Sequence, residues 1–258
     1  MKRVVQPALS RSRRGLFRAE SIGLATIVLT MLAWAMLPAT AQDPGYHHFA
    51  DQREWLGMPR AADVLSSLAF ALVGFAGVIR LASCRRPRFA PATDAGLWCI
   101  ALGLVLTAIG SAWYHRDPNN ATLVWDRLPM TLVFAGVLGA AIAQRIGSDV
   151  GRVALSLLVP LGVLSVLYWN MTGDLALYLA VQFGGIGGVL LLLVLTRKGN
   201  DPFPWAWVLA WYALAKIVEY WDRPIWDATH GLIAGHTLKH LLAAVAGAAL
   251  LWPLRARR

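Results

Sequence analysis

The sequence predicts an all-α integral membrane protein, a bundle of seven transmembrane helices preceded by one additional N-terminal signal or anchor helix. Of its 258 residues, 57% are hydrophobic and only 15% are charged, which is too apolar for a water-soluble domain of this size. Each apolar segment has the length of about 20 residues that an α-helix needs to cross a hydrocarbon core of ~30 Å. The short alternating segments of a barrel do not occur.

Eight apolar segments follow one another along the chain. They lie at residues 20–38, 63–83, 94–115, 121–143, 151–169, 173–196, 203–221 and 231–253. The first segment follows a basic stretch, and "PATAQD" after it offers a cleavage site behind Ala41. We therefore expect residues 1–41 to be a signal peptide or a retained anchor helix. Residues 42–62 are then an outer loop, and residues 63–258 are the seven-helix domain.

The distribution of lysine and arginine predicts the orientation. With the N-terminus inside, the inner segments carry seventeen of these residues. The outer segments carry five, at Arg53, Arg60, Arg116, Arg127 and Arg223. This bias follows the positive-inside rule and explains the net charge of +10 without a nucleic-acid partner. Together with the signal-like start, it predicts a multi-pass protein of a bacterial inner membrane.

Three polar residues interrupt the apolar hairpin "GSAWYHRDPNNATLVWDRLP". Ser111 and His115 are four residues apart, so they share one face at the outer end of their helix. Asp126 lies about five residues into the next helix, which places it ~8 Å below the turn and level with Ser111. The hairpin is therefore expected to bring all three side chains to a similar depth.

Two further histidines, His236 and His240, have the same spacing in "GHTLKHLLAAV" of the last segment. Four spans separate this segment from His115, so all three histidines are expected in the outer half of the membrane. Ionisable groups inside a membrane usually mark a functional site. Three neutral imidazoles can bind zinc and leave the fourth position open for water. Hydrogen bonds between helices and a bis-histidine haem stay open as alternatives, although an i, i+4 pair places both ligands on one side of a metal.

Together these motifs resemble the alkaline ceramidases. The features that carry the resemblance are Ser-x3-His, an aspartate eleven residues further on, and the C-terminal His-x3-His. More broadly, the chain is similar to the membrane hydrolase superfamily that also includes the progestin and adiponectin receptors. The resemblance covers the seven helices from residue 63 onward. It implies a seven-helix fold in which His115, His236 and His240 bind zinc, with Ser111 and Asp126 beside the metal.

The resemblance also implies a calcium site formed by acidic residues before and at the start of the first core helix. Asp51, Glu54 and Asp63 are the candidate ligands here, because calcium prefers oxygen ligands. Arg53 and Arg60 lie among these acids, so ion pairs explain the carboxylates equally well.

A second charged cluster is predicted where the seventh segment ends. Lys216 and Glu219 are three residues apart and can pair on one helix face. Lys239 is expected to point away from the two neighbouring histidines, toward Glu219 or Asp222. We interpret these residues as structural in preference to a headgroup site.

The function predicted from these residues is zinc-dependent hydrolysis of the amide bond in ceramide or a similar N-acyl lipid, on the periplasmic side. Zinc would lower the pKa of bound water to about 7. Asp126 would move the proton to the leaving amine, and Ser111 would donate a hydrogen bond to the oxyanion. A receptor-like protein with a structural zinc is the alternative within the superfamily. A transporter is disfavoured, because the inner halves of the helices are almost entirely apolar.

Overall fold

The computed structural model describes residues 25, 36, 38–83, 89–196 and 201–254 of the chain. Nearly all of the predicted N-terminal signal peptide or anchor helix lies outside these residues. The described residues form helices joined by short segments. In chain order they are η1 (Pro44–His47), α2 (Ala61–Ser66), α3 (Leu68–Ala82), α4 (Pro91–Arg116), α5 (Asn120–Arg145), α6 (Ser148–Thr172), α7 (Ala176–Leu179), η2 (Ala180–Gly184), α8 (Gly185–Leu195), α9 (Trp205–Tyr220), α10 (Asp222–Ala228), α11 (Gly235–Leu251) and η3 (Trp252–Leu254).

Five helical segments of the described chain are long and apolar enough to cross a membrane. They are Ala61–Ala82, Pro91–Arg116, Asn120–Arg145, Ser148–Thr172 and Ala176–Leu195. Helix α11 is also apolar but has only 17 residues, and α9 has 16. The chain is therefore a multi-pass helical membrane protein.

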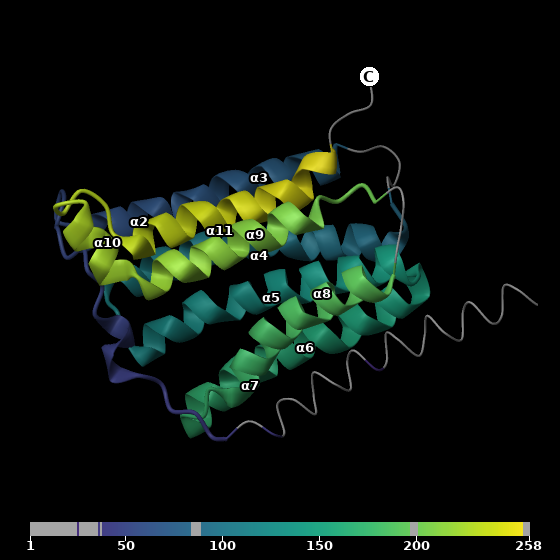
Figure 1. Cartoon of the computed structure of the whole chain (residues 1–258), viewed down its shortest axis with the longest axis horizontal. Coiled ribbons are helices and arrows are strands. Elements are labelled where there is room, and N and C mark those ends of the chain that lie inside the picture. Colours follow the sequence, from purple (N-terminus) through teal and green to yellow (C-terminus); the bar gives the residue numbers. More distant parts are fainter. Residues whose placement is uncertain (1–24, 26–35, 37, 84–88, 197–200, 255–258) are drawn as a thin grey trace, which may run out of the picture.

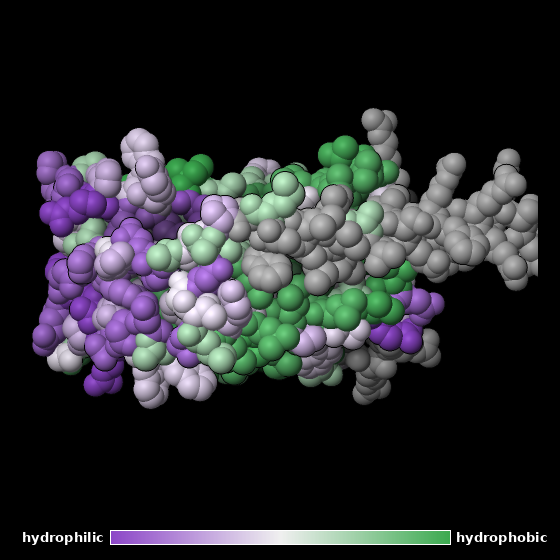
Figure 2. Space-filling model, turned by 90° about the horizontal axis from the view of Figure 1, so that it is seen from below, coloured by the Kyte–Doolittle hydropathy of each residue, from purple (hydrophilic) through white to green (hydrophobic). Residues whose placement is uncertain are grey.

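The outer surface of the bundle supports this conclusion. Along α3, exposed large apolar side chains recur at helical spacing at Leu68, Leu72, Phe75 and Ile79. Figure 2 shows hydrophobic residues over the middle of the described surface, and hydrophilic residues at the end that carries α10. An apolar band of this kind is stable against lipid tails but costly in water.

The helices lie side by side along one long axis (Figure 1). Helix α11 packs against α9 and α3, while α5 packs against α6 and α8. Helix α4 contacts both α3 and α5, so it joins the two groups. Between these elements lies a cavity of about 430 Å³, lined mainly by apolar side chains of α5, α8, α9 and α11.

The last predicted segment differs from the structure at its start. Helix α11 begins at Gly235 and not near residue 231, because His230 and Gly231 adopt positive φ angles of 52° and 77°. This turn ends the short helix α10, which the apolar pattern did not predict. The consequence is that His236 lies in the first turn of α11.

Candidate metal centre

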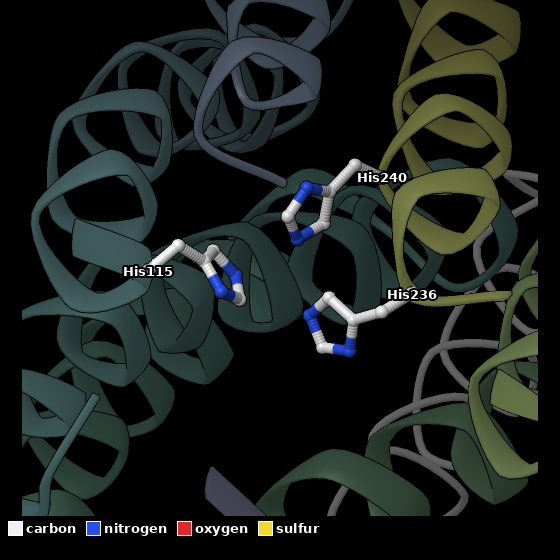
Figure 3. A group of neighbouring side chains, drawn as sticks. All are labelled: His115, His236 and His240. Atoms are coloured by element: carbon white, nitrogen blue, oxygen red, sulfur yellow. The ribbon is translucent and has the colours of Figure 1, made fainter. Parts of the chain in front are cut away.

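The three predicted histidines come together at the end of the bundle that carries α10. His115 lies near the end of α4, and Figure 3 shows its ring facing those of His236 and His240 from α11. One ligand atom from each ring lies within 4.8 Å of the other two, and all three side chains are buried. Among the described residues, this is the one group of three or more His, Cys, Asp or Glu side chains with such spacing. The geometry therefore confirms a site that could hold a metal ion.

Helix α11 reaches this position because its first residue is a glycine. A Cβ atom on Gly235 would lie 2.1 Å from the carbonyl oxygen of Val218, so a larger residue would push α11 away from α9. The backbone N–H of His236 donates to Oδ1 of Asp222 at 2.7 Å, and the N–H of Ala50 donates to Oδ2 at 2.9 Å. Asp222 thus caps α11 and ties the outer loop to the histidines.

An arginine from the outer loop fixes the end of α4. Arg60 donates from Nε to the carbonyl oxygen of His115 and from a terminal nitrogen to that of Arg116, both at 2.6 Å. These carbonyls have no partner within the helix, and a cation stabilises the negative end of the helix dipole. Arg60 therefore holds the backbone of a predicted metal ligand and does not pair with the acidic residues.

The hydrogen-bond partners of the ring nitrogens in His115 and His240 leave nitrogen atoms available for a metal. Both ring nitrogens of His115 are buried without a hydrogen-bond partner among the described residues, which is costly unless a ligand occupies them. The Oγ of Ser66 donates to the carbonyl oxygen of Asp63 at 2.9 Å and lies 2.7 Å from Nδ1 of His240. Because a hydroxyl has one hydrogen, Nδ1–H of His240 must be the donor in the second contact. Its Nε2 lone pair is then free for a metal.

The predicted Ser111 and Asp126 lie at the same level, because α4 and α5 approach closely at Gly110. A Cβ atom on Gly110 would lie 2.0 Å from the carbonyl oxygen of Trp125 and 3.2 Å from the Cα of Asp126. The Oγ of Ser111 lies 3.1 Å from that of Ser67. Ser111 and Asp126, with His240, line the cavity. The expected common depth is therefore confirmed, and the candidate centre opens onto an apolar space.

The lysines and the glutamate form the predicted ion-pair cluster. Lys239 Nζ lies 2.7 Å from Oε1 of Glu219, and Lys216 pairs with Oε2 of the same carboxylate. Lys239 Nζ is also 3.4 Å from Nε2 of His236, a longer contact than the one with Glu219. Glu219 therefore draws the ammonium group of Lys239 away from the histidine that it flanks.

Arg127, one of the five positive charges assigned to outer segments from the sequence, is buried in the fold. Its side chain is only 4% exposed and lines the cavity. The guanidinium carbon lies 4.2 Å from the ring centre of Trp169 and 4.8 Å from that of Tyr178. Sequence patterns near Arg127 do not predict this burial, because the aromatic partners Trp169 and Tyr178 come from α6 and α7.

The three acidic residues of the expected calcium site have different surroundings in the structure. Both carboxylate oxygens of Asp51 accept hydrogen bonds from Arg53, at 2.9 and 2.6 Å, which raise the pKa of that guanidinium. Asp63 accepts from Thr237 Oγ1 at 2.7 Å through Oδ1, and its Oδ2 has no partner among the described residues. Glu54 is exposed. The three carboxylates do not form a ligand group of the kind that the histidines form.

Two comparisons with known proteins identified no relative of this chain. A scan against models of protein families found no match, and a search of curated proteins found no matching sequence. The candidate site therefore stands on its own geometry.

Proposed function

We propose that the protein is a zinc-dependent intramembrane hydrolase that cleaves the amide bond of an N-acyl lipid, and that it is related to the alkaline ceramidases. One observation carries the proposal: three buried imidazoles converge, and one of them, His240, lines an apolar cavity together with Asp126 and Ser111. A hydrolase of long-chain amides needs these two things together, a polar reaction centre and an apolar space for the chain.

His115, His236 and His240 are the residues that would hold the metal. Three neutral imidazoles are the ligand set of catalytic zinc sites, and the unpartnered nitrogens of His115 support this assignment. The bound metal would supply a Lewis acid that polarises the amide carbonyl and activates water near neutral pH. The Ser66 contact, which leaves Nε2 of His240 as the acceptor, supports the same set.

Asp126 would transfer the proton, and Ser111 would stabilise the negative charge that develops on the carbonyl oxygen. Asp126 is buried on the cavity wall, where its carboxylate can take a proton from the attacking water and pass it to the leaving amine. Ser111 lies one helical turn before His115 and can donate a hydrogen bond to the oxygen of the scissile carbonyl. The products are a fatty acid and a free amine.

The full architecture that we propose has seven spans. Five are long enough by themselves, and α9 and α11 pack together within the same bundle and complete the set. The positive-inside bias then places the histidine site toward the outer side, which in a bacterial inner membrane faces the periplasm. Residues 1–41 would serve as the signal peptide or anchor that precedes this domain.

The test is amide hydrolysis by the purified protein and by an Asp126→Asn variant. Wild-type protein should release fatty acid from labelled N-acyl lipids, ceramide among them, and should contain about one zinc ion per chain. Asp126→Asn should keep the zinc and lose at least about a hundredfold in turnover, because general acid–base catalysis contributes on this order. Asp149→Asn, which changes an exposed aspartate of α6, serves as the matched control.

The same experiment separates the proposal from a receptor-like member of the superfamily. A protein that holds zinc stoichiometrically but hydrolyses none of the offered amides would have a structural metal and no hydrolase function. Equal turnover by wild type and Asp126→Asn would contradict the proposed role of this aspartate. Thermal melts of all variants show whether any loss reflects unfolding.

A further inference from the structure

We propose that Arg127 is the recognition site for an anionic group of the substrate, so that the preferred substrate is an N-acyl lipid with a carboxylate or phosphate on the amine side of the amide. This inference rests on the proposed function for the position of the amide. The anion site itself rests on the cavity and the charges that line it.

The first argument is the balance of buried charge. Three cationic side chains line the cavity, those of Arg127, Lys216 and Lys239. Both lysines pair with the single carboxylate of Glu219. Among the described residues, no carboxylate oxygen lies within 4.0 Å of a guanidinium nitrogen of Arg127, although Asp126 is its neighbour in the chain. Within the part of the chain that the structure describes, Arg127 is thus the cation of this cavity without an ion-pair partner.

The second argument is an unused donor. One terminal nitrogen of Arg127 donates to Oε1 of Gln42 at 2.7 Å. The other terminal nitrogen is buried and has no hydrogen-bond partner among the described residues. A buried charged donor without an acceptor destabilises the protein. A neutral oxygen could accept from this N–H, but only an anionic ligand would also neutralise the guanidinium charge and form the stronger, charge-assisted hydrogen bond.

The third argument is that the guanidinium is held ready for a ligand. The rings of Tyr46, Trp169 and Tyr178 surround its carbon at 5.4, 4.2 and 4.8 Å. Cation–π contacts stabilise the charge and fix the plane of the group, but they offer no acceptor in the direction of its N–H bonds. An arginine fixed in this way presents a fork that matches a carboxylate or a phosphate.

The shared cavity relates the anion to the reaction centre. Asp126 and Arg127 are consecutive residues, so their Cα atoms are about 3.8 Å apart, and both side chains line the cavity. Both side chains reach the same cavity of about 430 Å³, so one lipid molecule in it can place its amide beside Asp126 and an anionic group of its amine part on Arg127. An N-acyl amino acid, whose carboxylate is two bonds from the amide nitrogen, meets this requirement. The apolar part of the cavity, with Val133, Phe134 and Val189, then receives the acyl chain.

The experiment measures binding, so it does not depend on turnover. Asp126→Asn protein in detergent micelles is titrated with N-palmitoylglycine, with neutral N-palmitoylethanolamine and with the phosphate ester of the latter. At least one anionic ligand should bind at least tenfold more tightly than the neutral one. Preference for the glycine compound identifies a carboxylate, and preference for the ester identifies a phosphate.

Adding Arg127→Gln should bring the affinities for the charged and neutral ligands within about twofold of each other. Arg127→Lys, which keeps the charge but loses the fork, should retain part of the preference. Arg152→Gln is the matched control, because Arg152 is exposed on α6 and pairs with Asp149 there.

Equal binding of charged and neutral ligands to the parent protein would overturn the inference. A preference that survives Arg127→Gln would overturn it as well. If the preference exists but no amide is hydrolysed, the anion site stands and the proposed hydrolase function falls. If amides are hydrolysed without any preference for charge, the reverse holds.

Discussion

The histidine cluster and the acidic loop before it both combine several potential metal ligands, and they differ in what already occupies those ligands. In the cluster, His115 has two buried nitrogens without partners, and the rings converge within coordination distance. In the loop, both carboxylate oxygens of Asp51 accept hydrogen bonds from Arg53. The difference shows that ligand chemistry alone does not define a site. A metal site also needs several ligand atoms that converge on one point and have no other partner.

The largest expected effect is the loss of one imidazole. His236→Ala should reduce bound zinc from about one ion per chain to almost none, because two remaining imidazoles rarely hold zinc against water. His48→Ala, which removes an exposed histidine of the outer loop, should leave the zinc content unchanged. Elemental analysis of purified protein makes the measurement. Zinc retained at full stoichiometry in His236→Ala would show that the metal lies elsewhere.

The next largest effect is expected from a substitution that separates α4 and α5 beside the histidine cluster. Gly110→Ala would place a Cβ atom 2.0 Å from the carbonyl oxygen of Trp125, so α4 and α5 must separate. Overpacking of this kind costs about 1–3 kcal/mol, and it should lower the melting temperature in detergent as well as the zinc affinity. Gly187→Ala in α8 is the matched control, because nothing lies within 4 Å of its Cβ position. An unchanged melting temperature in Gly110→Ala would contradict this packing.

Much of the cluster was predictable because it depends on local spacing along each helix and on the expected order of the helices. The i, i+4 pairs give a shared face, and an even number of intervening spans returns the chain to the same side of the membrane. The pairing of Lys239 with Glu219 was predictable for the same reason. These arguments need only the helical repeat and the approximate limits of each span.

The remaining features could not be predicted, because they depend on contacts between distant segments. Arg60 caps α4 from a loop 55 residues earlier, and Asp222 caps α11 from a helix that the apolar pattern missed. Arg127 has the sequence context of an outer positive charge, yet rings from other helices bury it. Whether a charged residue near a helix end faces water or a cavity is decided by packing that a single sequence does not encode locally.

A weaker change sharpens the description of the histidine cluster. Ser66→Ala removes the acceptor of Nδ1–H of His240, so that ring loses its fixed orientation. Loss of such a partner typically reduces metal affinity about 10–100-fold, and we expect an effect of this size in a zinc competition assay with a chelator. Ser156→Ala, at an exposed position of α6, should have no effect. A zinc affinity equal to that of wild type would mean that Ser66 does not orient the ligand.

The smallest effects are expected in the acidic loop, and they decide how its carboxylates are used. Asp51 is fully buried and its partner Arg53 is half exposed, so Asp51→Asn should cost about 1–2 kcal/mol of stability through weakened charged hydrogen bonds. Glu54→Gln changes an exposed side chain and should alter stability by less than about 0.5 kcal/mol. Thermal melts with and without calcium measure both. If Arg53 is the partner of Asp51, calcium leaves the melting temperature of wild-type protein unchanged. A calcium-dependent rise that both substitutions abolish would instead show that a cation displaces Arg53 and that the loop, like the histidine cluster, is a metal site.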